Sequence, residues 1–266
     1  MHLPWNLVII GPSDSDSMTP EPSSENAAPP LGEAGRITGV FFDPKKAFAD
    51  IAARPSWIVP VVLMIVAALA FTYTYTTRIG WERYIRQTME NNPRVQNLPA
   101  DQRETQIQTG AKFAPIFGYV GSLVFIPIAA LVIGGVLLLV CKMMGAGGAL
   151  NFKQMFGITA YAMLPGLLSS ILAIIVMFIK NPDEFNLQNP LIFNLGALLE
   201  PPPNSGKFIY SLATSFDLFS FWTILLLATG ISVAARKFTF AKALIAVVLS
   251  WAVYVLIKSA WAGAFG

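Results

Sequence analysis

The residues that could support acid–base chemistry are few and widely spaced in this chain. The only histidine is His2 and the only cysteine is Cys141. An acid–base site would have to be assembled from polar residues of the second half of the chain: Tyr161, Asp183, Glu184, Glu200 and Asp217. General acid–base catalysis needs its groups within hydrogen-bonding reach of one substrate. An enzyme is therefore the least favoured of three hypotheses, and no catalytic residue is assigned.

The sequence also predicts no cofactor and no metal site. A zinc-like site needs a cluster of His and Cys ligands, and the chain has one residue of each type. The turn at residues 144–149 (MGAGGA) holds three glycines. It has neither the G-x-G-x-x-G order nor the GK[ST] ending of a phosphate-binding loop. Cys141 follows a run of Leu and Val and is interpreted as a packing residue.

The composition indicates a membrane protein. Only 12% of the 266 residues are charged, 55% are hydrophobic, and the mean hydropathy is +0.58. Soluble domains carry roughly 25% charged residues, and so few charges cannot cover the surface of a soluble protein this apolar. These values exclude a soluble enzyme, a nucleic-acid-binding domain and a disordered chain. The net charge of +3 is spread over all segments between the apolar runs, so no nucleic-acid partner is expected.

Five apolar segments define the expected fold. About 20 apolar residues in a helix cross the ~30 Å hydrocarbon core of a bilayer. The predicted fold class is all-α: a polytopic membrane protein with five transmembrane helices and amphipathic interfacial helices. The spans are expected at residues 57–77, 114–140, 156–179, 218–235 and 243–262. The fifth span contains Lys258, whose amine must reach the interface beside Trp261.

The segments outside the spans carry weaker patterns. Residues 1–35 are expected to form a disordered tail, because Pro, Ser and acidic residues dominate them and cannot bury enough apolar area to offset the ordering entropy. Met18 is an alternative start of the chain, which would make the first 17 residues a dispensable leader. Residues 36–266 form the predicted membrane domain.

Three segments of that domain are expected at the membrane surface. Asp43 followed by Pro44 predicts the start of a short amphipathic helix, with the apolar residues Ala47, Phe48 and Ile51 on one face. We expect that face to lie in the lipid headgroup region, with a polar leader to the first span as the alternative. Residues 78–112 predict a surface helical hairpin. The apolar decamer 190–199 is too short to span, so it either lies on the membrane or re-enters it.

Small residues and prolines mark the spans themselves. Small residues lie four apart at Ala130/Gly134, Gly166/Ser170 and Ala228/Ser232. Such pairs let helices approach closely in lipid, and packing within the bundle is favoured over a dimer interface. Pro127 and Pro165 lie inside the second and third spans. Interrupted helices can surround a cavity, so the alternative function is a permease or channel for a small neutral solute.

Three segments together resemble the Yip1 domain family in its bacterial form. They are FFDPKKAFADIAARPSWIVPVVL, which leads into the first span, ALNFKQMFGITAYAMLPGLLSSIL in the centre, and SFDLFSFWTILLLATGISVAARKFTFAKALIAVVLSWAV at the end. The resemblance covers roughly residues 36–262 and implies five membrane helices with a cytosolic N-terminus. On this basis the residues expected to pack helices or contact a partner are Tyr161, Pro165, Gly166, Ser170, Asp217, Trp222 and Gly230.

The resemblance informs the architecture more than the activity. Eukaryotic members of the family bind small GTPases of the Rab type. Those relatives carry an Asp-Leu-Tyr-Gly-Pro element ahead of the first span. That element is absent here. The favoured function is therefore a non-enzymatic integral membrane protein of Yip1 type. It would act through helix–helix, lipid or protein contacts in membrane organisation or a trafficking-like process, with the lipid bilayer and a membrane-protein partner or a second copy as its contacts.

The distribution of basic residues predicts the orientation. Both sides of the membrane receive nine basic residues if the five spans alternate, so the count alone is neutral. The short link at 236–242 holds three basic residues, and the opening segment holds Lys45, Lys46 and Arg54 shortly before the first span. Short basic links and the first span dominate orientation. We therefore expect the bacterial cytoplasmic (inner) membrane, with the N-terminus cytoplasmic and the C-terminus outside.

Overall fold

The computed structural model describes residues 29–90, 95, 97–202, 204–235 and 237–265. Within these ranges the chain is built of helices and connecting loops and contains no strand, which confirms the all-α prediction. The chain divides into two units, residues 1–30 and 31–266. Most of the predicted tail, residues 1–28, lies outside the described residues, and the first helix begins at Glu33, within the last three residues of the segment predicted as tail.

The second unit opens with two short helices, α1 (Glu33–Phe42) and α2 (Pro44–Ala53), which we call the N-terminal hairpin. Asp43 caps α2 by accepting a hydrogen bond from the backbone N–H of Lys46, and Pro44 occupies the first helical position. The helix start therefore lies where the Asp-Pro pair predicts it. Gly39 lets the two helices approach, because a Cβ at this position would lie 3.0 Å from Ala47 Cβ.

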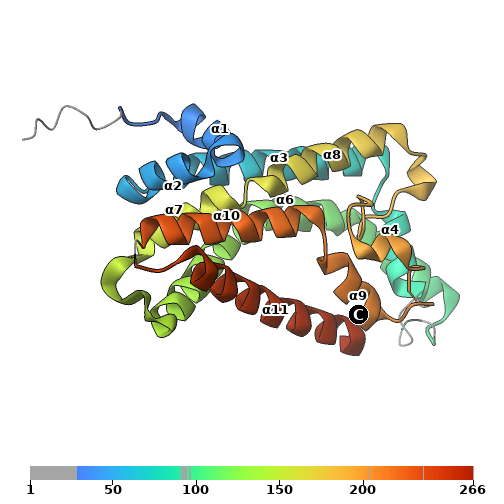
Figure 1. Cartoon of the computed structure of the whole chain (residues 1–266). Coiled ribbons are helices and arrows are strands. Elements are labelled where there is room, and N and C mark those ends of the chain that lie inside the picture. The colour runs from blue at the N-terminus through green and yellow to red at the C-terminus, as the bar shows by residue number, and fades with distance from the viewer. Residues whose placement is uncertain (1–28, 91–94, 96, 203, 236, 266) are drawn as a thin grey trace, which may run out of the picture. The chain divides into compact units, whose positions relative to one another are not determined.

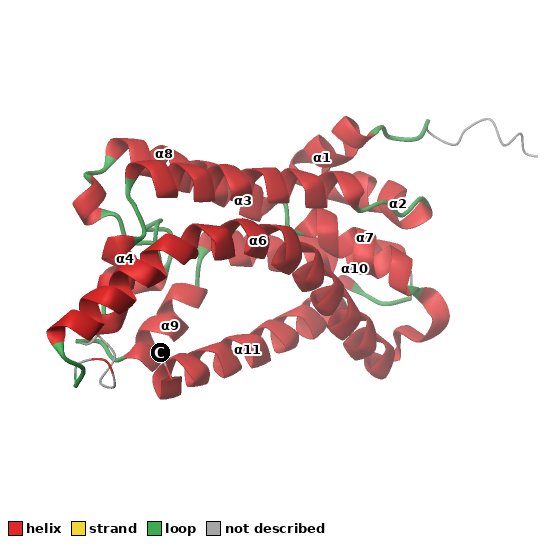
Figure 2. Ribbon diagram, turned by 180° about the vertical axis from the view of Figure 1, so that it is seen from behind, coloured by secondary structure: helices red, strands yellow, loops and turns green. Residues whose placement is uncertain are grey.

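The next helices are α3 (Ile58–Arg78), α4 (Glu82–Glu90) and α6 (Ala100–Cys141). The polar segment at 100–112 is continuous with the apolar segment that follows, so the second half of the predicted surface hairpin is the first part of α6. Pro115 and Pro127 both lie inside α6. Figure 2 shows α6 bending along its course, as expected for a helix that contains prolines.

A glycine-rich turn, in which Gly145 and Gly147 have positive φ, leads from α6 to α7 (Phe152–Ala162). Asn151 and Gln154 form a capping box at the start of α7: each side chain bonds the backbone of the other, at 2.9 and 3.2 Å. Helix α8 (Pro165–Ile179) follows after two residues, with Pro165 at its first position. The predicted third span is therefore two helices joined by a short break.

The last part of the chain holds α9 (Lys207–Ser215), α10 (Leu218–Ala234) and α11 (Phe240–Phe265). The decamer 190–199 lies beside the start of α10, because the Leu218 N–H donates to the Phe193 carbonyl at 3.0 Å and the Leu195 N–H donates to the Phe216 carbonyl at 3.2 Å. Ile192 is 73% exposed and Leu198 is 81% exposed. This segment is thus hydrogen-bonded to the bundle on one side, and its apolar side chains are exposed on the other.

Helix α7 occupies the centre of the second unit. Every residue from Met155 to Ala162 is buried, and α7 packs against α2, α6 and α10. On either side, α3 packs along α8 and α6, and α11 packs along α10 and α9. The N-terminal hairpin lies at one end of this bundle, while α4, α9 and the end of α11 lie at the other (Figure 1).

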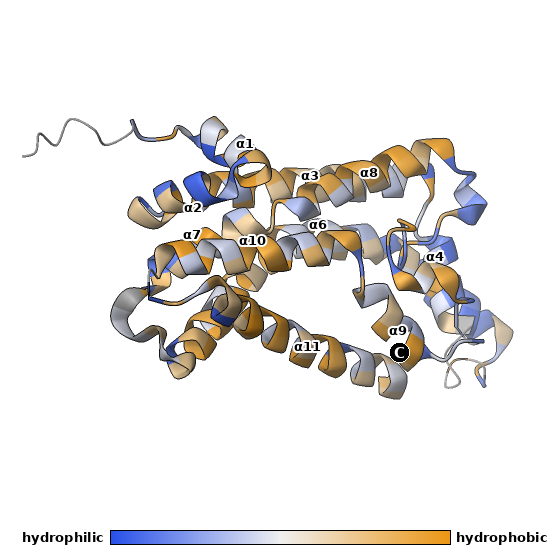
Figure 3. Ribbon diagram, in the orientation of Figure 1, coloured by the Kyte–Doolittle hydropathy of each residue, from blue (hydrophilic) through white to orange (hydrophobic). Residues whose placement is uncertain are grey.

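Four helical segments are long and apolar enough to cross a membrane: Ile58–Arg78, Ala100–Ala146, Phe152–Ile179 and Phe240–Phe265. Helix α10 is equally apolar but has 17 residues, which span about 25 Å at ~1.5 Å each. Large apolar side chains are exposed along α3, α6, α8 and α11. Figure 3 shows these helices as mainly hydrophobic and the hydrophilic residues concentrated in the hairpin and around α4. Such a surface suits lipid contact and confirms an integral membrane protein.

Candidate functional site

The N-terminal hairpin makes both polar and apolar contacts where it meets α7, α10 and the segment that enters α3. We call this contact the hairpin interface. Its polar half consists of Glu33, Arg36, Asp50, Ser56 and Tyr161, and its apolar half consists of Phe41, Phe48, Ile51, Ile158, Trp222 and Gly230.

An ion pair between α1 and α2 holds the hairpin closed. Arg36 Nε donates to Asp50 Oδ2 at 2.7 Å, and the two side chains are only 7% and 13% exposed. Asp50 also accepts from Arg54 and from the backbone N–H of Leu31, the latter at 3.2 Å. Because both charges are nearly buried, each depends on the other: removing one partner leaves the other charge without compensation.

The charge states follow from these contacts. Burial opposes the charge on Asp50 more than any other single factor, but hydrogen bonds from Arg36, Leu31 and Arg54 together hold its pKa below the usual value. Burial likewise opposes the charge on Arg36, and its hydrogen bonds to Asp50 and Tyr161 hold its pKa above the usual value. Both groups are therefore charged at neutral pH.

Tyr161 connects the hairpin to the centre of the bundle. Its side chain is fully buried in α7, and its hydroxyl donates to a carboxylate oxygen of Glu33. Ser56 lies 3.1 Å from the same hydroxyl and 3.1 Å from the other Glu33 oxygen, and it accepts from Arg36 at 2.7 Å. One tyrosine of the core is thereby joined to α1 and to the segment that enters α3.

The apolar half is packed around Gly230 of α10. A Cβ at this position would lie 2.5 Å from Ile158 Cγ2 and 3.0 Å from Phe48 Cδ1. Phe48 and Ile51 are fully buried. The expectation that the apolar face of α2 lies in the headgroup region is therefore wrong: this face packs on protein, because α7 and α10 present an apolar surface that fits it.

Trp222 extends the same contact toward the start of α10. Its ring lies 5.4 Å from that of Phe41 in an edge-to-face arrangement, which is a favourable geometry for aromatic pairs. Tyr161, Trp222 and Gly230 thus all contact the hairpin, although they come from two different helices and from sequence segments 60–70 residues apart.

The other predicted contact residues lie elsewhere. Pro165 is buried at the break between α7 and α8. Gly166 is exposed, and no described atom lies within 4 Å of a Cβ at its position. The Ser170 hydroxyl donates to the Gly166 carbonyl of its own helix at 3.0 Å. Asp217 caps α10 by accepting from the N–H groups of Phe219 and Ser220 at 2.9 and 3.0 Å. These residues do not join the hairpin interface.

The remaining small-residue pairs pack inside the bundle. Ala130 is fully buried, and a Cβ at Gly134 would lie 3.3 Å from Thr159 Oγ1 of α7. Ala228 is also fully buried, and Ser232 is half-buried. Cys141 is fully buried in the main core, as its packing interpretation requires.

Three of the four acidic residues considered for catalysis have separate partners. Asp183 pairs with Arg83, Glu200 accepts from Asn204 at 2.7 Å, and Asp217 caps α10. Tyr161 bonds Glu33 and Ser56 instead. The described residues contain no group of three or more His, Cys, Asp or Glu side chains placed to hold a metal ion.

Most of the polar half of the hairpin interface was not predicted from the sequence, because Tyr161 was its only member expected to make a contact. Glu33 lies in the segment assigned to the tail, and no contact was predicted for Arg36, Asp50 or Ser56. A signal was present for Arg36, because it precedes the buried Val40 by four residues and so shares its face of α1. Nothing local links Arg36 to Asp50 or Glu33 to Tyr161, which lie 14 and 128 residues apart.

Comparison with known proteins finds relatives over most of the chain, including the helices of the hairpin interface. The family model of the Yip1 domain matches residues 38–262. The chain is also similar to membrane protein YknW of Bacillus subtilis, at 28% identity over 199 residues that cover 75% of this chain and 78% of YknW. No solved structure gives a significant match. The range matched to the family contains all of α2, α7 and α10, which form most of the hairpin interface.

Proposed function

Because the chain belongs to the Yip1 domain family, we propose that it is a non-enzymatic integral membrane protein. It works through helix–helix, lipid or protein contacts, in membrane organisation or a trafficking-like process. The N-terminal hairpin, docked on α7 and α10, is the part that presents the contact surface.

The hairpin interface is the observation that carries this proposal. Three residues from the segments that resemble the family, Tyr161, Trp222 and Gly230, converge on the hairpin. Every buried side-chain nitrogen and oxygen of the described residues has a hydrogen-bond partner. Polar groups that are already paired with one another hold a structure in place, whereas acid–base chemistry needs groups directed at a substrate.

The outer face of the hairpin is the expected contact surface. Lys45, Lys46 and Thr38 are exposed on it, while the opposite face is buried in the bundle. A photo-reactive residue placed at Lys46 should form a discrete adduct with a protein partner or a second copy when membranes are irradiated. The same residue placed at Ala70, which is exposed on the apolar helix α3, should react with lipid only. Absence of any protein adduct from Lys46 and Thr38 would contradict the proposal.

The alternative function, a permease or channel, predicts a different result. Pro165 lies at a helix break, but Pro127 lies inside the continuous helix α6. If the protein were a permease, replacing Pro165 by Ala would change the flux of a neutral solute into vesicles that contain the protein. Unchanged flux, together with the Lys46 adduct, would favour the contact function.

We also propose that α10 crosses the membrane as the fourth of five spans, with α11 as the fifth, that the membrane is the bacterial inner membrane, and that the N-terminus is cytoplasmic. The hairpin and the end of α11 lie at opposite ends of the bundle (Figure 1), which supports an odd number of crossings. In a Cys141→Ser background, Ser205→Cys should react with an impermeant maleimide in intact cells, and Thr239→Cys should not. The reverse pattern would overturn the orientation.

A further inference from the structure

A second feature lies at the opposite end of the bundle, where α4 meets the first half of α6. An apolar groove of about 660 Å³ runs along this contact. One wall is formed by residues at and before the start of α4, and the other by residues of α6. The side chains that form them are Trp81, Tyr84, Ile85, Phe113, Ala114 and Phe117.

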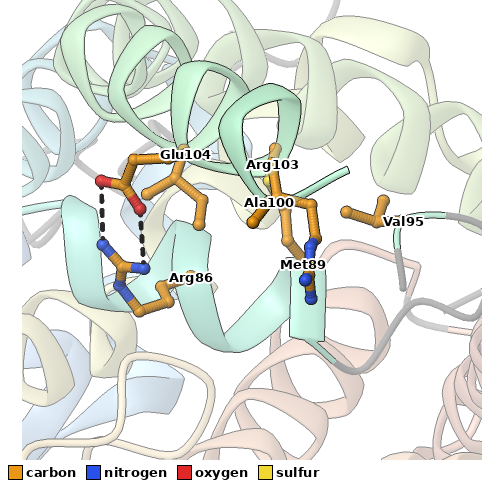
Figure 4. A pocket seen from close by; sticks show the side chains of 7 residues that line it. Arg86, Met89, Val95, Ala100, Arg103 and Glu104 are labelled. Atoms are coloured by element: carbon orange, nitrogen blue, oxygen red, sulfur yellow. Dashed lines mark hydrogen bonds and ion pairs between the residues drawn. The ribbon is translucent and has the colours of Figure 1, made fainter. Parts of the chain in front are cut away.

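The walls of the groove are held in place by contacts on both sides. The Trp81 indole N–H donates to Thr76 Oγ1 at 2.8 Å, and its ring packs edge-to-face on Tyr75 at 4.8 Å. Arg86 of α4 bonds both carboxylate oxygens of Glu104 of α6, at 3.0 and 3.2 Å (Figure 4). Bidentate pairs of this kind fix geometry, so this pair helps to hold α4 against α6 beside the groove.

The position of the groove along α6 indicates what can occupy it. Gln102, Gln106 and Thr109 share one face of α6 with Phe113 and Phe117, at the i, i+4, i+7, i+11 and i+15 spacing of a helix. The first three side chains offer hydrogen-bond donors and the last two are aromatic. The groove therefore starts where α6 changes from polar to apolar, which is the depth at which lipid headgroups meet lipid tails.

A positive charge lies at the polar end of the same contact. Arg103 is exposed, reaches across toward Met89 of α4 (Figure 4), and is in no ion pair among the described residues. The nearby Arg86 is already paired with Glu82 and Glu104. Arg103 is thus available to an anionic group, and a guanidinium binds phosphate oxygens well.

We propose that this groove holds one acyl chain of a bilayer phospholipid, whose phosphate group binds Arg103 and the donors at the start of α6. The exposed side chains Ile116, Phe117 and Val120 continue the apolar surface next to the groove, so a chain can enter sideways from the surrounding lipid. Apolar area alone gives no preference inside a bilayer. The preference for this site comes from the rigid aromatic walls and the charged end together.

The first test fills the groove. Ala114→Phe places a ring among the side chains that line it, and Ala260→Phe is the matched control, because Ala260 is exposed on α11 outside the groove. Each protein is reconstituted in vesicles of phosphatidylcholine and phosphatidylglycerol, extracted with mild detergent, and weighed by native mass spectrometry. The wild type and Ala260→Phe should retain a bound phospholipid. Ala114→Phe should retain about tenfold less, which corresponds to about 1.4 kcal/mol.

The second test removes the charge and leaves the packing intact. Arg103→Gln should lower the retained phospholipid, and most strongly the anionic phosphatidylglycerol, whereas Lys112→Gln should not. Lys112 is an equally exposed basic residue of α6, but it lines neither the groove nor the hollow beside Arg103 at the polar end of the α4–α6 contact. Because Arg103 is exposed, Arg103→Gln should fold normally, and it therefore tests the proposal even if Ala114→Phe fails to fold.

Three results would overturn the proposal. The first is equal lipid retention by Ala114→Phe and Ala260→Phe. The second is equal retention by Arg103→Gln and Lys112→Gln. The third is a wild-type protein that carries no lipid, or that carries a second copy of itself in a form that Ala114→Phe abolishes, since the groove would then be empty or a dimer contact.

Discussion

Gly230 offers the sharpest test of the hairpin interface. In Gly230→Ala the new methyl group would lie 2.5 Å from Ile158 Cγ2 of α7 and 3.0 Å from Phe48 Cδ1 of the hairpin, so α10 must move slightly away from both. Overpacking of a core costs about 1–3 kcal/mol. Alanine recovers up to about 1 kcal/mol through its better helix propensity. Because a contact of 2.5 Å calls for the upper part of the overpacking range, we expect a net destabilisation of about 1–2 kcal/mol. It should be detected first as undocking of the hairpin.

The control is the same substitution at a glycine whose added methyl group would contact no neighbouring atom. Gly166 lies in α8 with no atom within 4 Å of a Cβ at its position. Gly166→Ala should therefore keep only the helix-propensity gain and leave the protein unchanged or more stable by up to about 1 kcal/mol. Sequence reasoning treats the two glycines alike, so the contrast between them measures tertiary packing alone.

Release of the hairpin can be followed by cysteine reactivity. Ala52 is 8% exposed on the buried face of α2, so Ala52→Cys in a Cys141→Ser background reacts with maleimide only when the hairpin opens. The labelling rate should rise roughly tenfold for each ~1.4 kcal/mol lost. Ile158→Ala removes the nearest atom, so the double variant with Gly230→Ala should cost less than the sum of the two single changes. If Gly230→Ala labels no faster than Gly166→Ala, the packing argument fails.

The polar half of the interface and the α10 cap give further predictions. Tyr161→Phe removes a hydroxyl bonded to Glu33 and Ser56 and should destabilise hairpin docking by about 1.5 kcal/mol; an unchanged Ala52→Cys labelling rate would contradict this. The pKa of Asp50 is lowered in the folded protein, so its stabilisation is complete above the unfolded value of about 3.9 and is lost as the pH falls through the lower folded value. The Ala52→Cys labelling rate, divided at each pH by the rate of a fully exposed cysteine, should therefore rise below about pH 4 in the wild type, because the thiolate of both cysteines decreases equally with pH. Asp50→Asn should be less stable at pH 7 and lack that acid dependence; an identical acid profile in both would assign it to another group. Asp217→Ala should cost about 1 kcal/mol through loss of the α10 cap, measured as a lower Tm, while Asp43→Ala should act on α2 and raise the labelling rate.

Local chemistry explains which parts of the fold were predictable. Asp43 with Pro44 starts α2, and Asp217 starts α10, because a capping carboxylate satisfies backbone N–H groups of its own helix. The long helices were predictable for a similar reason, because the apolar runs that indicate them are the residues that form them. The family resemblance was also sound, since it rested on three such segments.

The parts that were not predictable depend on distant residues. An amphipathic helix buries its apolar face against lipid or against protein, and the pattern of Phe48 and Ile51 is the same in both cases. The burial of Phe48 depends on Gly230, which lies about 180 residues further on, and Ile51 lies against Gly157, about 105 residues further on. The pairs Arg36–Asp50 and Glu33–Tyr161 join different helices, so neither spacing nor composition connects them.

The distance between the hairpin and its docking site also has a consequence for how the protein is made. A ribosome adds about 5–20 residues per second, so Phe48 is synthesised roughly 10–40 s before Gly230. During that interval the hairpin has its apolar face and no α10 to cover it. The nearest surface that accepts an amphipathic helix is the membrane itself. We therefore expect the hairpin to rest on lipid while the chain grows, and to move onto protein only when α10 has been inserted. Its docking is a late event of biogenesis, and a protease-resistant hairpin would distinguish finished chains from those that stop before Gly230.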